Sequence, residues 1–254
     1  MTSWLVRRLV LPAAVLIAAC GQPGLVTGAS DAAGNVGADA GVGGSDAGAD
    51  AGSDAGVDAG ADAGTITPGA YANRIVSFTP GPGAGFGQSS LPGIVLGPPE
   101  GAGSGAGSFD VLSLGNGGEI ILAFDGLVMV DRPGVDLLVF ENAFAGFSET
   151  GVVGVSDDGI NWTDWPCASD DVDAGFPGCA GVHPVFSSTT SGISAFDPAA
   201  AGGDGFDLAT LGLSRARYVR IRDTGKNRYA PTSGGFDLDA IAILHVTLPD
   251  GGPR

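Results

Sequence analysis

Between residues 71 and 246 the chain consists of short apolar or alternating runs, separated by Gly, Pro, Asp and Asn. No stretch of 12 residues there shows the 3.6-residue period of an amphipathic helix, and short runs bounded by turn residues are typical of strands. The pattern predicts an all-β fold, a β-sandwich of the jelly-roll type, over residues 68–248, followed by a C-terminal tail at 249–254. We expect strands at Arg74–Phe78, Val111–Leu114, Glu119–Phe124, Val135–Glu141, Gly151–Ser156, Arg217–Asp223 and Phe236–Val246.

Residues 20–67 have a different composition. Aspartates recur every four residues from Asp46 to Asp62, each followed by Ala-Gly. Gly at every turn costs about 1 kcal/mol in a helix, and like charges four residues apart repel each other. The segment is therefore expected to be a disordered Gly/Ala/Asp linker. A calcium-binding solenoid is the alternative, but such repeats contain bulky residues that fill a core, and these do not.

The chain carries 28 acidic and 11 basic residues, for a net charge of −17. So acidic a surface repels phosphate backbones, which argues against nucleic acid as a partner.

Residues 1–19 have the composition of an export signal. Arg7 and Arg8 precede an apolar run that ends at Cys20, and this run is too short to span a bilayer. The residues Ile17-Ala18-Ala19-Cys20 resemble the lipobox of bacterial lipoproteins, in which the cysteine is acylated and anchors the protein to the membrane. The residue after Cys20 is Gly21 and not the aspartate that signals retention in the inner membrane. The resemblance therefore implies the outer membrane, with the domain at the surface or facing the periplasm. An ordinary secretory signal with an incidental cysteine is the alternative.

Two further cysteines, Cys167 and Cys179, remain in the exported part of the chain. An even number of cysteines in such a chain predicts a disulfide. A zinc site is the competing interpretation, but two cysteines without further nearby ligands make a poor set.

Two segments resemble the discoidin-like, galactose-binding-like jelly rolls. They are Val155-Ser156-Asp157-Asp158-Gly159-Ile160-Asn161-Trp162 and Ala216-Arg217-Tyr218-Val219-Arg220-Ile221. The resemblance implies a tight Asp-Gly turn between two strands, a Trp packed on the return strand, and a later strand with its apolar residues inward. Asp158-Gly159 suits such a turn, which requires a positive φ.

A more specific resemblance is to a group of bacterial surface proteins that has no established activity. It rests on Asn73-Arg74-Ile75-Val76-Ser77, Phe140-Glu141-Asn142-Ala143-Phe144 and Gly234-Gly235-Phe236-Asp237-Leu238-Asp239-Ala240.

Several carboxylates interrupt or end apolar strands. Strand periodicity places Asp239 on the same face as Ile241 and Ile243, and Glu141 at the end of the face that Val135, Leu137 and Val139 share. A buried carboxylate requires a cation or several hydrogen-bond donors, and calcium takes oxygen ligands. The alternatives are ion pairing or turn capping, and catalysis. The candidate calcium ligands are Glu141, Asn142, Asp204, Asp207, Asp237 and Asp239.

A basic cluster precedes the last strand, and it consists of Arg215, Arg217, Arg220, Arg222, Lys226 and Arg228. It allows two interpretations: arginines that bind an anionic sugar, or a solvated strand face balanced by neighbouring aspartates. Trp162 is expected in the core, whereas Trp165, near the disulfide loop, is expected to form an exposed platform. The candidate ligand-binding residues are Trp165, Arg220, Arg222 and Tyr229.

These features favour a surface-anchored, non-catalytic lipoprotein that binds a glycan or a surface protein and contains a calcium ion as a possible cofactor. Neither a Ser-His-Asp nor a Cys-His arrangement stands out. A structural or adhesion module of the cell envelope is one alternative. A glycan-active enzyme is the other, because glycoside hydrolysis requires only two carboxylates.

The lipid anchor leads to a direct prediction. Cys20→Ala should release the protein from membranes, because the acylated residue is removed. Fractionation of cells that express the two forms measures this, and a Cys20→Ala protein that still sediments with membranes would count against lipidation.

Overall fold

The computed structural model describes residues 69–226 and 234–252. In these residues nearly all regular structure is antiparallel β, as the sequence predicts. One sheet has the order β1-β12-β6-β9, with β3 paired to β12, and a second has the order β2-β4-β11-β7-β8. A small third sheet has the order β10-β5-β13. The strands are β1 (Ala70–Tyr71), β2 (Arg74–Thr79), β3 (Leu112–Ser113), β4 (Glu119–Ala123), β5 (Val128–Val130), β6 (Leu137–Glu141), β7 (Gly151–Ser156), β8 (Thr163–Asp164), β9 (Asp204–Phe206), β10 (Arg215–Ala216), β11 (Tyr218–Asp223), β12 (Asp237–Ile243) and β13 (Val246–Thr247).

The helical content of the described residues is limited to three short 3-10 turns: η1 (Gln88–Ser90), η2 (Gly93–Val95) and η3 (Leu208–Leu211). No helix in the same residues is long and apolar enough to cross a bilayer. The signal segment, Cys20 and the Asp-Ala-Gly repeat lie outside the described residues, and so does Tyr229.

All seven predicted strands are present, although the last one is interrupted: β12 ends at Ile243 and β13 begins at Val246. The sequence does not reveal β1, β5, β8, β9 or β10. These have two or three residues each, which is too short for a two-residue period to be recognised.

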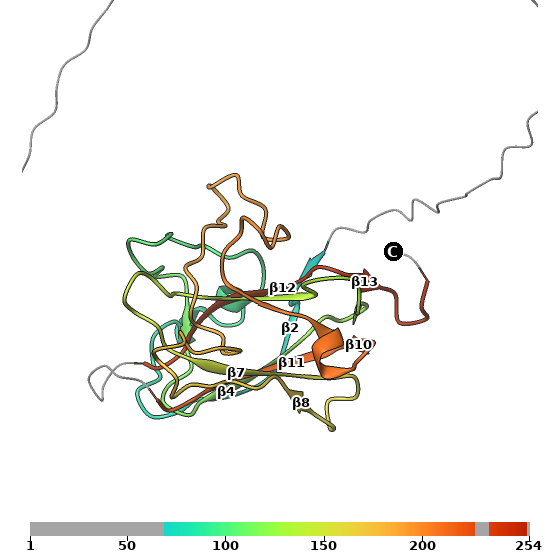
Figure 1. The fold of residues 1–254 in the computed structure, drawn as a ribbon, viewed down its shortest axis with the longest axis horizontal. Helices are drawn as coiled ribbons and strands as arrows, with labels where there is room; N and C mark the ends of the chain where they lie inside the picture. The colour runs from blue at the N-terminus through green and yellow to red at the C-terminus, as the bar shows by residue number, and fades with distance from the viewer. Residues whose placement is uncertain (1–68, 227–233, 253–254) are drawn as a thin grey trace, which may run out of the picture. The chain divides into compact units, whose positions relative to one another are not determined.

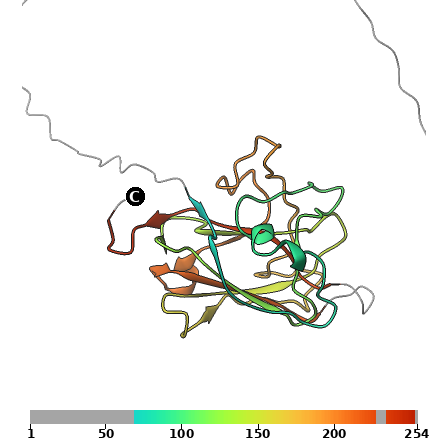
Figure 2. The same cartoon turned by 180° about the vertical axis from the view of Figure 1, so that it is seen from behind.

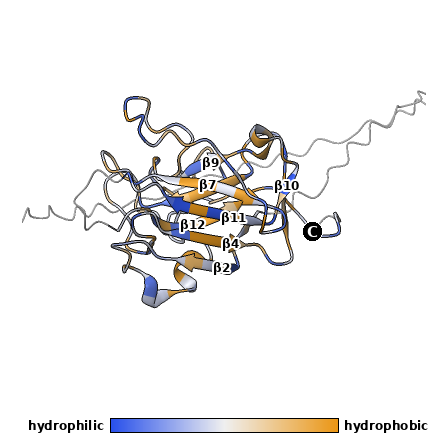
Figure 3. Ribbon diagram, turned by 90° about the horizontal axis from the view of Figure 1, so that it is seen from below, coloured by the Kyte–Doolittle hydropathy of each residue, from blue (hydrophilic) through white to orange (hydrophobic). Residues whose placement is uncertain are grey.

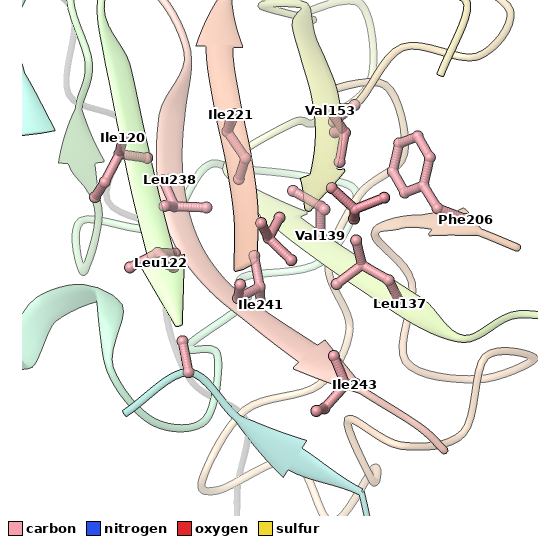
Figure 4. Packing of buried hydrophobic residues seen from close by; sticks show 14 of the residues in the cluster. Ile120, Leu122, Leu137, Val139, Val153, Phe206, Ile221, Leu238, Ile241 and Ile243 are labelled. Atoms are coloured by element: carbon pink, nitrogen blue, oxygen red, sulfur yellow. The ribbon is translucent and has the colours of Figure 1, made fainter. Parts of the chain in front are cut away.

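The main core lies between the two larger sheets, which form the two layers visible in Figures 1 and 2. Side chains from β4, β11 and β7 point toward those of β6 and β12 in Figure 4. On β11, Val219 and Ile221 are fully buried, whereas Arg220 and Arg222 are only partly buried, so the predicted inward and outward alternation is confirmed. Figure 3 shows the same contrast, with β4 largely hydrophobic and hydrophilic positions on β11.

A second apolar cluster covers the other face of β6 and β12. It contains Leu138, Phe140, Ala240 and Ala242, together with residues of the 185–201 loop region. Both faces of these central strands are therefore buried, which agrees with their nearly continuous apolar sequence.

A bulge in β12 corrects one detail of the sequence prediction. The register with β6 shifts between Leu238 and Ala240. Leu238 therefore packs in the main core with Ile241, three residues away, whereas strict alternation would place these two side chains on opposite faces. The extra residue is Asp239.

The discoidin-like turn has the expected geometry. Gly159 has a φ of 75°. The Gly159 N–H donates a hydrogen bond to the Ser156 hydroxyl at 2.9 Å. Backbone N–H groups of Ile160 and Asn161 donate to Asp158, and these bonds hold the pKa of that exposed carboxyl well below its usual range.

The predicted disulfide is present, and it joins Cys167 to Cys179 across 12 positions, with a Cα–Cα distance of 4.5 Å. Replacing both cysteines with serine should lower the free energy of unfolding by about 3 kcal/mol, because the open loop gains conformational entropy in the unfolded chain. Urea unfolding followed by tryptophan fluorescence measures this, and a double variant as stable as the native chain would show that the loop is held by other contacts.

Candidate functional site

Two of the motif segments found in the sequence meet at one end of the first sheet. Glu141 pairs with Leu238, and Asp237 pairs with Ser113 of β3. The register therefore places the end of β6, the start of β12 and β3 side by side. Asn142 follows β6 directly, so that it lies at the same sheet end as Asp237.

A pocket of about 500 Å³ opens over this sheet end. Asn142 and Asp237 line it, and four phenylalanines contribute its apolar surface. Backbone of residues 105–108, from a Gly-rich loop, lines it as well. The apolar lining residues are Phe86, Phe109, Phe144, Phe147, Val111 and Ala106.

The phenylalanines differ in exposure. Phe109 is 86% exposed and Phe86 is 50% exposed, which is unusual for such large apolar side chains. Phe144 and Phe147 stack in parallel, with ring centroids 4.9 Å apart and an interplanar angle of 2°. Exposed aromatic surface that borders a concave site is typical of ligand-binding regions.

Asn142 connects the loop to the sheet. Its Nδ2 donates to the Ser108 carbonyl and to Asp237 Oδ2, both at 3.3 Å. Gly107 must remain without a side chain, because a Cβ there would lie 2.3 Å from Asn142 Oδ1. The loop thus packs directly on the polar groups of the sheet end.

Three buried oxygens at this sheet end have no hydrogen-bond partner. They are Glu141 Oε2, Asn142 Oδ1 and Asp237 Oδ1. The other unpartnered buried atoms in the described residues belong to one aspartate, Asp157, and to three arginines of opposite charge, Arg217, Arg220 and Arg222. Because an unsatisfied buried polar group is costly, these oxygens make this sheet end the candidate site of the described residues.

The two carboxylates have altered acidity. Burial and the nearby charge of Asp237 raise the pKa of Glu141 well above its usual value. Burial also raises the pKa of Asp237 to about 6, against the opposing effect of the Ser113 hydroxyl. Raised pKa values in a cleft are a common property of functional carboxylates.

The six predicted calcium ligands do not form one site. Glu141, Asn142 and Asp237 come together at this sheet end, where Asn142 and Asp237 line the pocket, and the other three lie elsewhere. Both oxygens of Asp239 accept from the Glu100 N–H, at 2.9 and 3.1 Å. Asp239 is separated from Asp237 and Glu141 because it occupies the bulge in β12 and no longer lies on the strand face that alternation predicts.

Asp204 and Asp207 satisfy backbone donors. Asp204 accepts from the N–H groups of Gly181 and Val182, at 2.7 and 3.0 Å, and contacts His183 Nδ1 at 2.7 Å; this hydrogen bond raises the pKa of His183. Asp207 caps η3 by accepting from the Ala209 N–H. Turn capping, one of the alternatives open from the sequence, describes both residues.

Asp207 also belongs to a group of three carboxylates with Asp131 and Asp136, whose oxygens lie within 4.8 Å of one another. Asp136 is fully buried, accepts from the N–H groups of Arg132 and Leu208, and contacts His245. The carboxylate oxygens of this group are of the type that calcium takes as ligands. The sequence does not single out Asp131 or Asp136.

Two members of the basic cluster, Arg220 and Arg222, are ion-paired within the sheet that contains β11. Arg220 and Arg222 both bind Asp164, and the Arg220 guanidinium also lies 4.6 Å from the centre of the Trp162 ring. This arrangement agrees with the interpretation of a strand face balanced by aspartates. The candidate calcium ligands take no part in these pairs.

The predicted environments of the two tryptophans are reversed. Trp165 is wrong as an exposed platform: it is 6% exposed, packs on Phe206 and donates through Nε1 to Thr210 at 2.9 Å. The Trp165 N–H bonds to the Val153 carbonyl, so the strand alternation directs its ring into the core and that of Trp162 to the outer face.

The four phenylalanines are not among the residues that the sequence pattern predicts for a site. Phe86 lies within the Gly-rich segment Gly81–Gly87, and Phe109 lies two residues after the Gly-rich segment Gly101–Gly107. Neither segment has the features of a phosphate-binding loop. An aromatic residue in a glycine-rich loop has few neighbours that could bury it, and this is the signal that could have identified them.

No protein-family model matches the chain, and no curated protein matches it in sequence. Function must therefore be inferred from the residues of the site itself.

The buried acids predict a pH dependence of stability. Burial raises the pKa of Asp239 to about 8, from 3.8. The folded chain therefore holds this proton more tightly than the unfolded chain, so the free energy of unfolding falls as the pH rises from 3.8 toward 8. Asp239→Asn should remove part of this slope, up to about 1.4 kcal/mol per pH unit.

Urea unfolding at pH values of about 5, 6.5 and 8 measures the slope. Asp173→Asn, at an exposed position, is the matched control and should leave it unchanged. An Asp239→Asn variant with the native slope would show that Asp239 titrates normally in the folded chain.

Proposed function

We propose that this protein is a surface-anchored, non-catalytic lipoprotein that binds a glycan in the phenylalanine-lined pocket. The observation that carries the proposal is the combination of exposed aromatic rings with unpartnered acceptors on Asn142 and Asp237. Small-molecule sites typically pair a largely apolar concave surface with a few placed polar groups.

A sugar suits both parts of this pocket. Its C–H face packs on aromatic rings, and its hydroxyls donate to carboxylate and amide oxygens. The exposed Phe109 and Phe86 are accessible to a ligand that approaches from solvent. Asp237 and Asn142 would then orient the sugar through hydrogen bonds.

Anchoring completes the proposal. A lipid on Cys20 and a flexible linker over residues 20–67 would hold the domain away from the outer membrane, where the pocket could reach a surface component. Calcium is proposed as a stabilising ion, and Asp131, Asp136 and Asp207 are the group of carboxylates that could hold it.

A glycan-active enzyme is the second candidate, because Glu141 and Asp237 are neighbours with raised pKa values and no arginine partner in the described residues. Of the two, however, only Asp237 lines the pocket, and Glu141 is 1% exposed. Two catalytic carboxylates must both reach the scissile bond, so binding without catalysis is the better fit. A structural adhesion module would need neither the pocket nor its unpartnered acceptors.

A glycan array probed with the full chain, with and without a calcium chelator, tests the binding proposal. We expect a glycan signal that Phe109→Ala reduces roughly tenfold, because an aromatic contact worth about 1.4 kcal/mol is removed. Ile160→Ala is the control, since Ile160 is 80% exposed but lies at the β7–β8 turn.

Each arm has a separate reading. A blank array in both conditions would overturn glycan recognition and favour the adhesion module. A signal lost only with chelator would support calcium. Release of new reducing ends from a bound glycan, abolished in Glu141→Gln, would favour the enzyme.

A further inference from the structure

We propose that the pocket selects sugars that carry a free, protonated amine, such as glucosamine residues, over their N-acetylated or neutral counterparts. This inference rests on the proposed glycan binding and names the class of sugar. It derives from the charge and the hydrogen-bonding character of the part of the pocket that Asp237 and Asn142 form. We call this part the pocket floor.

The side chains of the floor present unpartnered acceptors. Asp237 and Asn142 line the pocket, and one oxygen of each, Asp237 Oδ1 and Asn142 Oδ1, is buried without a hydrogen-bond partner. The Asn142 Nδ2 group, the donor among these side chains, is already bonded to Ser108 and Asp237. An ammonium group has three donors and no acceptor, so it complements such a floor, whereas an N-acetyl group would bring a carbonyl oxygen against these acceptors.

Among the described residues, the ionisable groups that face Asp237 are all acidic. Asp237 is faced by Glu141 from β6 and by Asp223 from the end of β11, and its other polar neighbours, Ser113 and Asn142, are neutral. No Lys, Arg or His in the described residues lines the pocket. A positive group on the ligand would therefore supply the missing counter-charge in a partly desolvated place.

The aromatic surface favours the same ligand class. Phenylalanine rings attract cations to their faces through the ring quadrupole, and a cation within about 6 Å of a ring centre gains from this. Phe86, Phe109, Phe144 and Phe147 all line the same pocket as Asp237. An amine bound to Asp237 would thus share the pocket with these four rings.

Calorimetric titration of the full chain with three trisaccharides tests the inference. The probes are the trimer of glucosamine, the trimer of N-acetylglucosamine and cellotriose, at a pH above the pKa of Asp237. We expect the glucosamine trimer to bind at least ten times more tightly than the other two. Asp237→Asn should weaken its binding at least tenfold, and Phe109→Ala should also weaken it.

Asp173→Asn removes one negative charge at an exposed position and is the matched control, because simple attraction of a cationic sugar to this acidic protein would respond equally to both charge changes. Equal losses in the two variants, or no loss in Asp237→Asn, would overturn the inference. Thermal unfolding of each variant confirms that it is folded.

The remaining outcomes separate the two proposals. Tighter binding of N-acetylglucosamine or cellotriose would overturn the amine selectivity and leave glycan binding in place. Failure of all three probes, together with a blank array, would overturn both. Failure of all three with a signal from other glycans on the array would overturn the amine selectivity alone.

Discussion

The pairing of β12 with β6 is the interaction on which the rest of this domain depends. These two strands lie in the middle of the first sheet, and both of their faces are buried, one in the main core and the other under the loops around residues 185–201. β1 and β3 both pair with β12. Any polar group at the end of this strand pair is therefore enclosed by several chain segments, and this is where Glu141 and Asp237 lie.

The fold could be predicted from the sequence where the strands are long enough to show a period. The apolar runs at β4, β6, β7, β11 and β12 are of this kind, and each was located correctly. Strands of two or three residues form because a neighbouring strand offers unpaired backbone groups, and this long-range condition leaves no local pattern. The bulge at Asp239 is likewise set by pairing with β6, so strict alternation misplaced Leu238 relative to Ile241.

The site was only partly predictable, for a related reason. Strand-end carboxylates interrupt an apolar pattern, and this made Glu141, Asn142 and Asp237 visible as candidates. Whether such a carboxylate meets a backbone donor, as Asp204 does, or none, as Asp237 Oδ1 does, depends on loops distant in sequence. The exchanged environments of Trp162 and Trp165 have the same origin, because the parity of β8 is fixed by its pairing with β7.

The aromatic and the polar residues of the pocket contribute differently to binding. Aromatic rings near the solvent provide contact area with no charge to desolvate, and they pack on any ligand with an apolar face. The floor is different, since a largely buried carboxylate with one unpartnered oxygen destabilises the folded chain, and an amide of the same shape would lower that cost. An acid at this position is therefore poorly explained by stability alone. A ligand that brings donors or a positive charge gives the carboxylate a physical role, and it turns a general aromatic surface into a selective one.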